Sequence, residues 1–400
     1  MLSVKQADQA IGKITISIKT ETILFREACG RVLAEDIRAD RDLPPFNRSL
    51  MDGIAVNFKA YQKGCRAFIR EGIQPAGYPA RTLKSLSGCI EIMTGAVLPD
   101  GCDCVIPVER LKTDGKTVYV DGNAPGGKWQ HVHMKGSDRK KGDVLIEKGS
   151  VIGAVETGLL AAVGKAKVKV RRKLQVAVIS SGDELVDVEK PTKLFQIRKA
   201  NSYFMEALLQ GTGLCDTQVV HFMDNKQQIK RGLKIILASA DVVVLTGGVS
   251  MGKYDFIPPV MAELCVRQIF HKVRQKPGKP FWFGVSPQGR PVFALPGNPV
   301  STQAGLRRYV VPFVQKAATG RAPAVLRLKL GVSLVPPTAW TYFLPVKVRS
   351  DKDGTLWGDP CVYSGSGDFS SLAGSDGFVE IPEKTAKAAK GDVFNYFPWK

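Results

Sequence analysis

The sequence predicts a multidomain α/β protein whose central domain is a doubly wound α/β fold. Between residues 173 and 322, the apolar runs "LQVAVIS", "CDTQVVHF", "DVVVLTGG" and "GRPVFALPG" alternate, for the most part, with segments of helical character. Continuous apolar strands of this kind indicate a parallel sheet that helices cover on both faces. The chain has 400 residues, more than one hydrophobic core usually serves, and β-like runs prevail both before and after this region.

The flanking regions suggest three further domains. Helical spacing occurs at residues 4–14 and again at 28–33, and residues 140–164 read as a strand followed by a helix. Short β-like runs broken by Gly, Pro and Asp lie between these segments and return after residue 324. The expected domains are 1–42 with 139–172 (an elongated helical and strand domain), 43–138 (an inserted β-rich domain), 173–322 (the α/β domain) and 323–400 (a C-terminal β-barrel, with a sandwich as the alternative).

The formal charge of +20 requires an anionic partner, either a polyanion or a small, highly charged ligand. Nucleic acid is disfavoured, because no aromatic residues interleave with the densest basic stretch, "GKAKVKVRRKL", and no zinc-finger or RNP-type motif is present. That stretch alternates Lys and Arg with Val and Ala, which favours a strand with one solvated face. A small anionic ligand is therefore the better expectation.

The amino terminus, the apolar segments and the cysteines of the chain point to a cytoplasmic protein. The amino terminus has no apolar stretch typical of a secretory signal, and no segment approaches the ~20 apolar residues of a membrane helix. The eight cysteines are scattered without a CxxC pair, which indicates reduced thiols. Cys102 and Cys104 lie in an alternating, strand-like segment without a second pair, so buried packing is favoured over zinc.

Three predicted strands end in loops that suit a phosphate-bearing ligand. Ligands of open α/β sheets bind beyond the carboxyl ends of the strands, where glycines expose N–H groups to anions. A tight turn is the alternative for any one loop, but three such loops and the paired lysines of "KPGKP" in one domain favour a phosphate chain on the backbone. The candidate residues are Ser181 and Gly182; Gly247, Gly248 and Ser250; Pro296, Gly297, Asn298, Pro299 and Ser301; and Lys276 and Lys279.

Acidic residues near the same loops predict a divalent metal ion. Phosphate oxygens with one or two carboxylates form the usual site for Mg²⁺. Glu184 and Asp255 are the candidate ligands, and Asp224 is a further acidic candidate. Each acid alone also suits a helix cap or a solvated charge, and Asp224 before "NKQQ" suits an N-cap.

Nine stretches of the chain, in order, resemble the molybdopterin molybdotransferases of molybdenum-cofactor biosynthesis, a family that includes the E domain of gephyrin. One such motif is weak evidence for the resemblance, but nine motifs in family order over nearly the whole chain are specific evidence for it. They are "LPPFNRSLMDGIAV", "EIMTGAVLPDGCDCVIPVE", "KGSDRKKGDVL", "VAVISSGDELV", "IRKANSYFMEALLQGTG", "VVVLTGGVSMGKYD", "KPGKPFWFG", "LPGNPVS" and "SGSGDFSSLAGSDGFVEIP".

The resemblance implies insertion of molybdate into the dithiolene of adenylylated molybdopterin, with Mg²⁺ and release of AMP. It implies a homodimer in which each cleft joins the molybdopterin-binding α/β domain of one subunit to the inserted domain of the other. A molybdopterin adenylyltransferase is a candidate partner. By match to the motifs, Asp52, Thr94, Glu184 and Asp255 are expected to be catalytic, and Asp138, Asp224 and the loop residues named above to bind substrate.

The sequence also departs from the family pattern and leaves other interpretations open. Asn47, Lys199-Ala200 and the pair His131 and His133 stand where other residues are common. These changes bear on ligand-binding detail, and molybdate and tungstate are too similar for the sequence to separate. The alternatives are a molybdopterin adenylyltransferase or related nucleotide pyrophosphatase, and a non-catalytic scaffold. The inserted "MDG" and "MTG" stretches and the "SGSGDFSSL" tail argue against the first alternative, and the full set of acids and lysines argues against the second.

Overall fold

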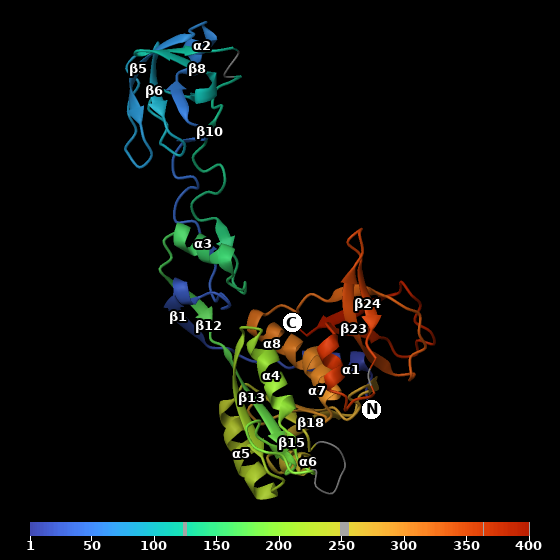
Figure 1. The fold of residues 1–400 in the computed structure, drawn as a ribbon. Coiled ribbons are helices and arrows are strands. Elements are labelled where there is room, and N and C mark those ends of the chain that lie inside the picture. The colour runs from blue at the N-terminus through green and yellow to red at the C-terminus, as the bar shows by residue number, and fades with distance from the viewer. Residues whose placement is uncertain (123–125, 249–255, 363, 400) are drawn as a thin grey trace. The chain divides into compact units, whose positions relative to one another are not determined.

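The computed structural model describes residues 1–122, 126–248, 256–362 and 364–399 (Figure 1). The chain forms two compact units. The large unit comprises Met1–Glu35, Gly149–Ala154 and Lys167–Lys400, and the small unit comprises Asp36–Lys148 and Val155–Ala166. Within the described residues, no helix combines the length and the apolar character that crossing a membrane requires.

A six-stranded sheet forms the centre of the large unit, in the order β16-β13-β17-β21-β20-β18. The first four strands, which the sequence predicts, are parallel. The other two, β20 and β18, were not predicted and run antiparallel to their neighbours, so the sheet is not parallel throughout. A short turn at 286–290 joins β20 to β21, and only antiparallel neighbours can be joined so briefly. The strands are β13 (Leu174–Ser181), β16 (Cys215–Phe222), β17 (Val242–Thr246), β18 (Arg267–His271), β20 (Trp282–Val285) and β21 (Pro291–Leu295).

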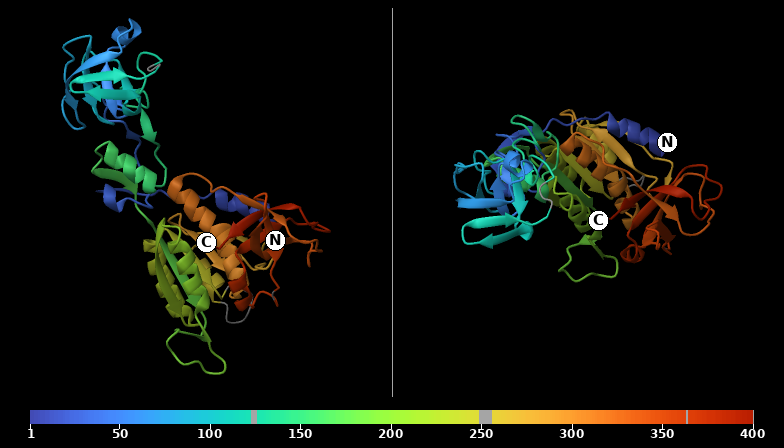
Figure 2. Two further views of the ribbon diagram at one scale, coloured as in Figure 1. Left: turned by 45° about the horizontal axis from the view of Figure 1, so that its top comes forward. Right: turned by 90° about the horizontal axis from the view of Figure 1, so that it is seen from above.

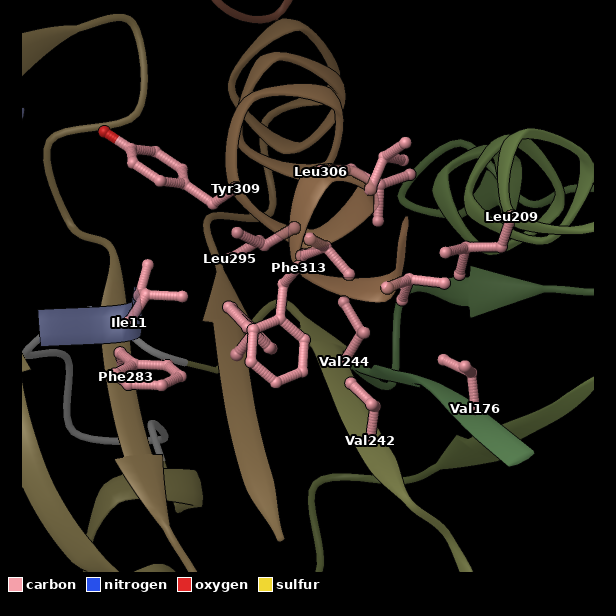
Figure 3. Close-up of a cluster of buried hydrophobic side chains, with 14 of the residues drawn as sticks. Ile11, Val176, Leu209, Val242, Val244, Phe283, Leu295, Leu306, Tyr309 and Phe313 are labelled. Carbon is pink, nitrogen blue, oxygen red and sulfur yellow. The ribbon is translucent and has the colours of Figure 1, made fainter. Parts of the chain in front are cut away.

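Helices cover both faces of this sheet, because successive side chains of each strand point to opposite faces and both sets are apolar. Val176 and Val178 pack with α4 and α8, whereas Ala177 and Ile179 pack with α5 and α6. Figure 3 shows part of the first cluster, with Val242 and Val244 of the sheet near Phe313 of α8. The helices are α4 (Ala200–Gln210), α5 (Lys226–Ser239), α6 (Ile257–Glu263), α7 (Pro299–Gly305) and α8 (Val311–Thr319), with a π-helical turn, η3 (Leu306–Val310), between the last two.

The N-cap of helix α5 lies one residue after the predicted cap, Asp224. Asn225 is the N-cap, since its side chain accepts a hydrogen bond from the N–H of Gln228 at 3.0 Å. Asp224 instead donates its own backbone N–H to the Asp183 carboxylate at 2.9 Å. The interpretation of Asp224 as the helix cap is therefore wrong.

The first 35 residues contain one helix, not two. Helix α1 (Val4–Gly12) has a capping box at Ser3 and Gln6 and buries Val4, Ala7 and Ile11. The helical spacing at 28–33 does not give a second helix: Val32 and Leu33 form isolated bridges to Val151 and Val170. Neighbouring elements are β1 (Thr20–Leu24), which pairs with β12 (Lys167–Arg171), and a 3₁₀ turn, η1 (Phe25–Glu27).

The C-terminal region is a five-stranded closed barrel, as predicted. Closure follows from the pairing of β23 with β25, which joins the two ends of the order β23-β24-β22-β26-β25. Figure 2 shows its red strands beside the orange helices of the α/β domain, and Phe343 and Phe378 of the barrel share a core with Phe313. The elements are β22 (Leu326–Leu330), β23 (Thr341–Ser350), β24 (Leu356–Pro360), β25 (Gly377–Ile381), β26 (Val393–Pro398) and the 3₁₀ turn η4 (Ser370–Gly374).

The small unit is β-rich, as predicted. Its six-stranded sheet has the order β7-β4-β6-β5-β9-β8, and both Cys102 and Cys104 are buried in its core. Burial raises the pKa of the Cys104 thiol to about 12, which suits a packing role. The elements are β2 (Ile37–Arg38), β3 (Arg48–Ser49), β4 (Gly53–Val56), α2 (Phe58–Gln62), β5 (Ala67–Gln74), β6 (Gly88–Ile92), β7 (Cys104–Pro107), η2 (Val108–Arg110), β8 (Leu111–Asp114), β9 (Thr117–Val120), β10 (Val132–His133), β11 (Val144–Ile146) and α3 (Ala154–Ala162), which begins in the large unit.

Candidate functional site

The loops after β13, β17 and β21 lie together at one edge of the central sheet. Gly247 and Gly248 have φ angles of +87° and +63°, the left-handed region that favours glycine. A Cβ on either would lie 2.9 Å from an atom of Ser181, the carbonyl oxygen for Gly247 and the hydroxyl for Gly248. A Cβ on Gly297 would lie 3.6 Å from the Cα of Gly247. The close approach of the three loops thus requires glycine at 247 and 248 even before any ligand is considered.

These loops line a hollow of about 420 Å³, called the strand-end hollow below. Sequence analysis predicts six of its lining residues: Ser181, Glu184, Gly247, Gly297, Asn298 and Pro299. Two short strands that pair at its rim, β14 (Leu185–Val186) and β15 (Ile197–Arg198), also contribute, as does the start of α4. The hollow is therefore built from the carboxyl ends of parallel strands, where open α/β sheets bind ligands.

Two polar atoms on its wall have no hydrogen-bond partner among the residues that the structure describes. One is the Oγ of Ser181, a residue that is only 5% exposed, and the other is the Oδ1 of Asn201. Leaving buried polar atoms unpaired is costly, so such atoms in a hollow indicate a site that a ligand completes.

A second hollow, of about 490 Å³, contains the predicted lysines and is called the lysine hollow below. Its predicted lining residues are Lys276, Lys279, Pro296, Asn298 and Ser301. Lys276 and Lys279 are both exposed, and the Lys279 ammonium lies over the Trp340 ring, 5.1 Å from its centroid. Neither lysine forms a salt bridge within the described residues. Both cations are thus available to an anion.

The turn that carries these lysines is held by buried hydrogen bonds. Gln275 is 1% exposed; its Nε2 donates to the Gly278 carbonyl at 3.0 Å, and its Oε1 accepts from the Tyr309 hydroxyl. Gln275 and Lys276 form β19 (Gln275–Lys276), which pairs in parallel with β23 of the barrel. The lysine positions are therefore fixed by both the α/β domain and the barrel.

Asn298 lines both hollows, so the two adjoin at the loop after β21. Its side chain donates to the Ser366 hydroxyl at 2.9 Å, and the Val300 N–H donates to the Ser366 carbonyl at 3.0 Å. Ser366 belongs to the "SGSGDFSSL" stretch, whose shape depends on Asp368: that carboxylate accepts from the Ser364 N–H at 3.0 Å and from the Ser370 hydroxyl at 2.8 Å. The C-terminal signature of the sequence therefore forms one wall of the site.

The remaining predicted residues of this domain lie beside the hollows or outside the described residues. A Cβ on Gly182 would lie 2.4 Å from the Glu184 carboxylate, so glycine lets Glu184 fold back over the strand end. Gly248 and Asp224 line neither hollow. Ser250 and Asp255 lie outside the described residues.

The donor set fits a magnesium ion only if substrate supplies most of the ligands. Glu184 is exposed and is the carboxylate that the described residues bring to the strand-end hollow. No group of three His, Cys, Asp or Glu side chains suited to a metal occurs in the described part of the chain. Mg²⁺ commonly binds through one or two carboxylates, phosphate oxygens and water, and this arrangement suits such a site.

In the small unit, Asp52 and Thr94 form a hydrogen-bonded pair. The Asp52 Oδ1 accepts two hydrogen bonds, one from the Thr94 N–H at 2.6 Å and one from the Thr94 hydroxyl at 2.9 Å. These two bonds lower the pKa of Asp52 below its usual value. Gly53 positions this acid, since a Cβ there would lie 2.0 Å from the Ile106 carbonyl oxygen of β7. Thr94 thus orients the Asp52 carboxylate through both its backbone N–H and its hydroxyl.

Asp138, also in the small unit, interacts with one of the unusual histidines. His133 Nε2 lies 2.8 Å from the Asp138 Oδ1, and this hydrogen bond is the main cause that lowers the pKa of Asp138. His133 Nδ1 lies 3.2 Å from an Arg48 nitrogen. His133, on β10, therefore connects the acidic side chain of Asp138 to the basic side chain of Arg48 on the paired strand β3.

Replacing Thr94 by valine is expected to raise the pKa of Asp52 toward its ordinary value, because the hydroxyl donor is lost while the backbone N–H remains. Thr94→Ser should keep the pKa low. Since the folded-state pKa is depressed, the pair stabilises the fold above the unfolded pKa of Asp52, and this stabilisation is lost as pH falls through the folded value. In Thr94→Val, this stabilisation should be lost at a higher pH than in the wild type, because the folded-state pKa of Asp52 is higher. Carbon-13 NMR titration of the Asp52 carboxyl measures this, and equal values in the two variants would contradict it.

Several residues of the hollows were not predicted as site residues. Asn201, Arg198 and Lys199 lie in the strand-end hollow, and Trp340 lies in the lysine hollow. Lys199 is held by Asp187, whose carboxylate lies 2.6 Å from its ammonium. The position of Asn201 at the start of a helix after an exposed strand–loop segment was the available signal.

Fold and site together define a multidomain α/β protein with two adjoining hollows beside the carboxyl ends of its parallel strands. Residues 2–164 match the MoeA N-terminal region (domain I and II), 177–316 a probable molybdopterin binding domain, and 327–399 the MoeA C-terminal region (domain IV). The chain belongs to the MoeA family, which confirms the resemblance drawn from its motifs.

Individual relatives match over their full length. The molybdopterin molybdenumtransferase of Synechocystis sp. is 36% identical over 400 residues and covers 100% of both chains. That of Haemophilus influenzae is 31% identical over 412 residues, covering 100% of this chain and 99% of the relative. A crystal structure of the molybdopterin biosynthesis MoeA protein from Pyrococcus horikoshii is similar with a TM-score of 0.83 and 31% identity, covering 100% of this chain and 99% of that one.

Proposed function

We propose that this chain inserts molybdate into adenylylated molybdopterin and releases AMP. The observation that carries the proposal is that two hollows, one lined by strand-end loops and one by lysines, adjoin at Asn298. The reaction brings together a pyrophosphate-linked substrate and a separate oxyanion, so it needs two neighbouring anion sites. Curated relatives that match the whole chain are named molybdopterin molybdenumtransferase, which supports the assignment.

The lysine hollow suits molybdate. Lys276 and Lys279 offer two ammonium groups, and Ser301 also lines this hollow. Charge-assisted hydrogen bonds of this kind bind an oxyanion and hold it in place for reaction. The strand-end hollow then accommodates the adenylylated part of the other substrate, with its pyrophosphate near Ser181, Gly247 and Gly297.

Glu184 and Asp255 would hold Mg²⁺ together with pyrophosphate oxygens and water. A bound Mg²⁺ supplies Lewis-acid stabilisation of the charge that develops as the phosphoanhydride breaks. The residues of the chain bind and orient the two anions, and their fixed positive charges lower the cost of bringing them together.

Asp52, Thr94 and Asp138 are proposed to act from the small unit of a second subunit in a homodimer. This follows from the family resemblance and agrees with the ionised, oriented state of Asp52. We further infer a cytoplasmic enzyme, in keeping with eight unpaired cysteines, that receives its substrate from a molybdopterin adenylyltransferase.

The test is to incubate the purified protein with adenylylated molybdopterin and Mg²⁺, with and without molybdate, and to measure AMP. AMP release that depends on molybdate is expected. Release independent of molybdate would favour a nucleotide pyrophosphatase, and no release from folded protein would favour a scaffold. A parallel series with tungstate determines which oxyanion the enzyme prefers.

A further inference from the structure

The side-chain amide of Asn201 is held in one orientation at the wall of the strand-end hollow. Its Nδ2 donates to the Gly297 carbonyl at 2.7 Å and lies 3.3 Å from the hydroxyls of both Thr246 and Thr302. Those two hydroxyls donate in turn to the Pro296 carbonyl. A carbonyl oxygen cannot donate, and the threonine protons are already committed, so only the amide nitrogen fits on this side.

The oxygen of the amide is consequently fixed on the opposite side. Asn201 Oδ1 is buried and has no partner among the residues that the structure describes. It can only accept hydrogen bonds, since an amide oxygen carries no proton. A phosphate group at this position would bring two acceptors together and leave both unsatisfied.

We propose that Asn201 Oδ1 recognises an uncharged N–H or O–H donor of the substrate and that the phosphates lie elsewhere in the hollow. The proposal rests on the proposed function and specifies how the substrate is oriented there. Ser181 Oγ, the other unpartnered atom, can donate and so suits the phosphate side. Asn201 is thus a specificity-determining residue that sequence analysis did not include in the site.

Nearby charges agree with this division of the hollow. The Lys199 ammonium lies beside the Asp187 carboxylate at 2.6 Å, and its side chain is only 14% exposed, so much of its charge is already compensated. The pKa of His221, on the neighbouring strand β16, is lowered by burial first and then by the charge of Lys199, which favours a neutral imidazole. The charge of Lys199 is therefore largely compensated at the end of the hollow formed by α4, while Arg198, which also lines the hollow, donates from its Nε to the Val188 carbonyl at 3.0 Å.

The donor can belong to the nucleoside or to the pterin, because both carry N–H groups and the ribose carries hydroxyls. Calorimetric binding distinguishes these sources with five probes: AMP, purine riboside 5′-monophosphate without the amino group, 2′,3′-dideoxy-AMP, molybdopterin and inorganic pyrophosphate. Each is titrated into the full-length wild-type protein and into Asn201→Leu. Thr302→Val, which removes one partner of Nδ2 and leaves Oδ1 in place, is the matched control.

Loss of the donor should weaken binding by roughly ten-fold, because a buried acceptor is then left unpaired. If the nucleoside supplies the donor, the wild-type and Thr302→Val proteins bind the AMP analogue that lacks this donor roughly ten-fold more weakly than AMP. Asn201→Leu then binds AMP and that analogue equally. If the pterin supplies it, Asn201→Leu weakens molybdopterin alone. In either case pyrophosphate binding should stay unchanged.

The proposal is overturned if Asn201→Leu binds all five probes as the wild type does, or if it loses pyrophosphate as strongly as the organic ligands. Should Asn201→Leu fail to fold, judged by its thermal melt, the smaller Asn201→Ser replaces it in the same series. If the wild-type protein releases AMP with molybdate but the Asn201 variant binds every probe as the wild type does, this inference is wrong and the proposed function stands.

Discussion

Replacing Lys276 and Lys279 together by methionine is expected to reduce molybdate-dependent AMP release by about 100-fold or more. Each lysine offers a charge-assisted hydrogen bond to an anion in the lysine hollow, and such bonds are worth about 1.5–3 kcal/mol each. Both side chains are exposed, so the fold should tolerate the change. Initial rates of AMP release at several molybdate concentrations measure the effect.

The barrel provides a matched control for this double variant. Lys329 and Lys390 also lie near a tryptophan, with their ammonium groups 5.6 Å and 6.0 Å from the Trp357 ring centroid, but they line neither hollow. Lys329→Met with Lys390→Met removes the same charge and should leave the rate nearly unchanged. An equal loss in both double variants would mean that the overall positive charge, and not the lysine hollow, attracts the substrates.

Glu184→Gln is expected to lower AMP release by roughly 100-fold and to raise the Mg²⁺ concentration needed for half-maximal rate. The substitution keeps the size of the side chain but removes the carboxylate charge at the strand-end hollow, and hard cations bind charged oxygen far better than amide oxygen. The rate should be measured over a Mg²⁺ series at fixed substrate. A variant that keeps the wild-type rate and Mg²⁺ dependence would remove Glu184 from the metal site.

Two further measurements sharpen the Glu184 result. Asp183→Asn removes the neighbouring charge, yet the amide oxygen can still accept from the Asp224 N–H, so its rate should stay close to that of the wild type. In a homodimer whose clefts are shared between subunits, mixing Glu184→Gln and Asp52→Ala subunits should give a rate well above that of either variant alone. Unrestored activity in demonstrably mixed dimers would place both residues in clefts of a single subunit.

Sequence alone predicted which loops gather at the strand-end hollow, because these loops follow parallel strands. The carboxyl ends of β13, β17 and β21 meet at one edge of the sheet, so the loops at Ser181, Gly247 and Gly297 had to approach one another. The lysines could also be predicted from their turn. The antiparallel edge formed by β18 and β20 was not predicted, because neither strand was among the apolar runs identified in the sequence.

Other features depended on contacts between distant residues. The Asp52–Thr94 pair spans 42 residues, and each member alone resembled an ordinary turn acid or a strand-end hydroxyl. The spacing of Ala28, Val32 and Leu33 suggested a helix, but Gly30 has a φ of +80°, and Val32 and Leu33 form isolated bridges instead. The role proposed for Asn201 depends on the direction of its side-chain hydrogen bonds, and no residue pattern in the sequence predicts that direction.

The pairing of β19 with β23 has a consequence for engineering and evolution of the chain. Gln275 and Lys276 complete the ladder of a domain to which they do not belong in sequence, so the terminal domain cannot be exchanged as an independent cassette. A graft from a relative would inherit its own version of strand β23 and could displace the ammonium groups even with every lysine retained. Shortened forms that end before residue 323 would lose that ladder partner and should be poor starting points for redesigning oxyanion preference.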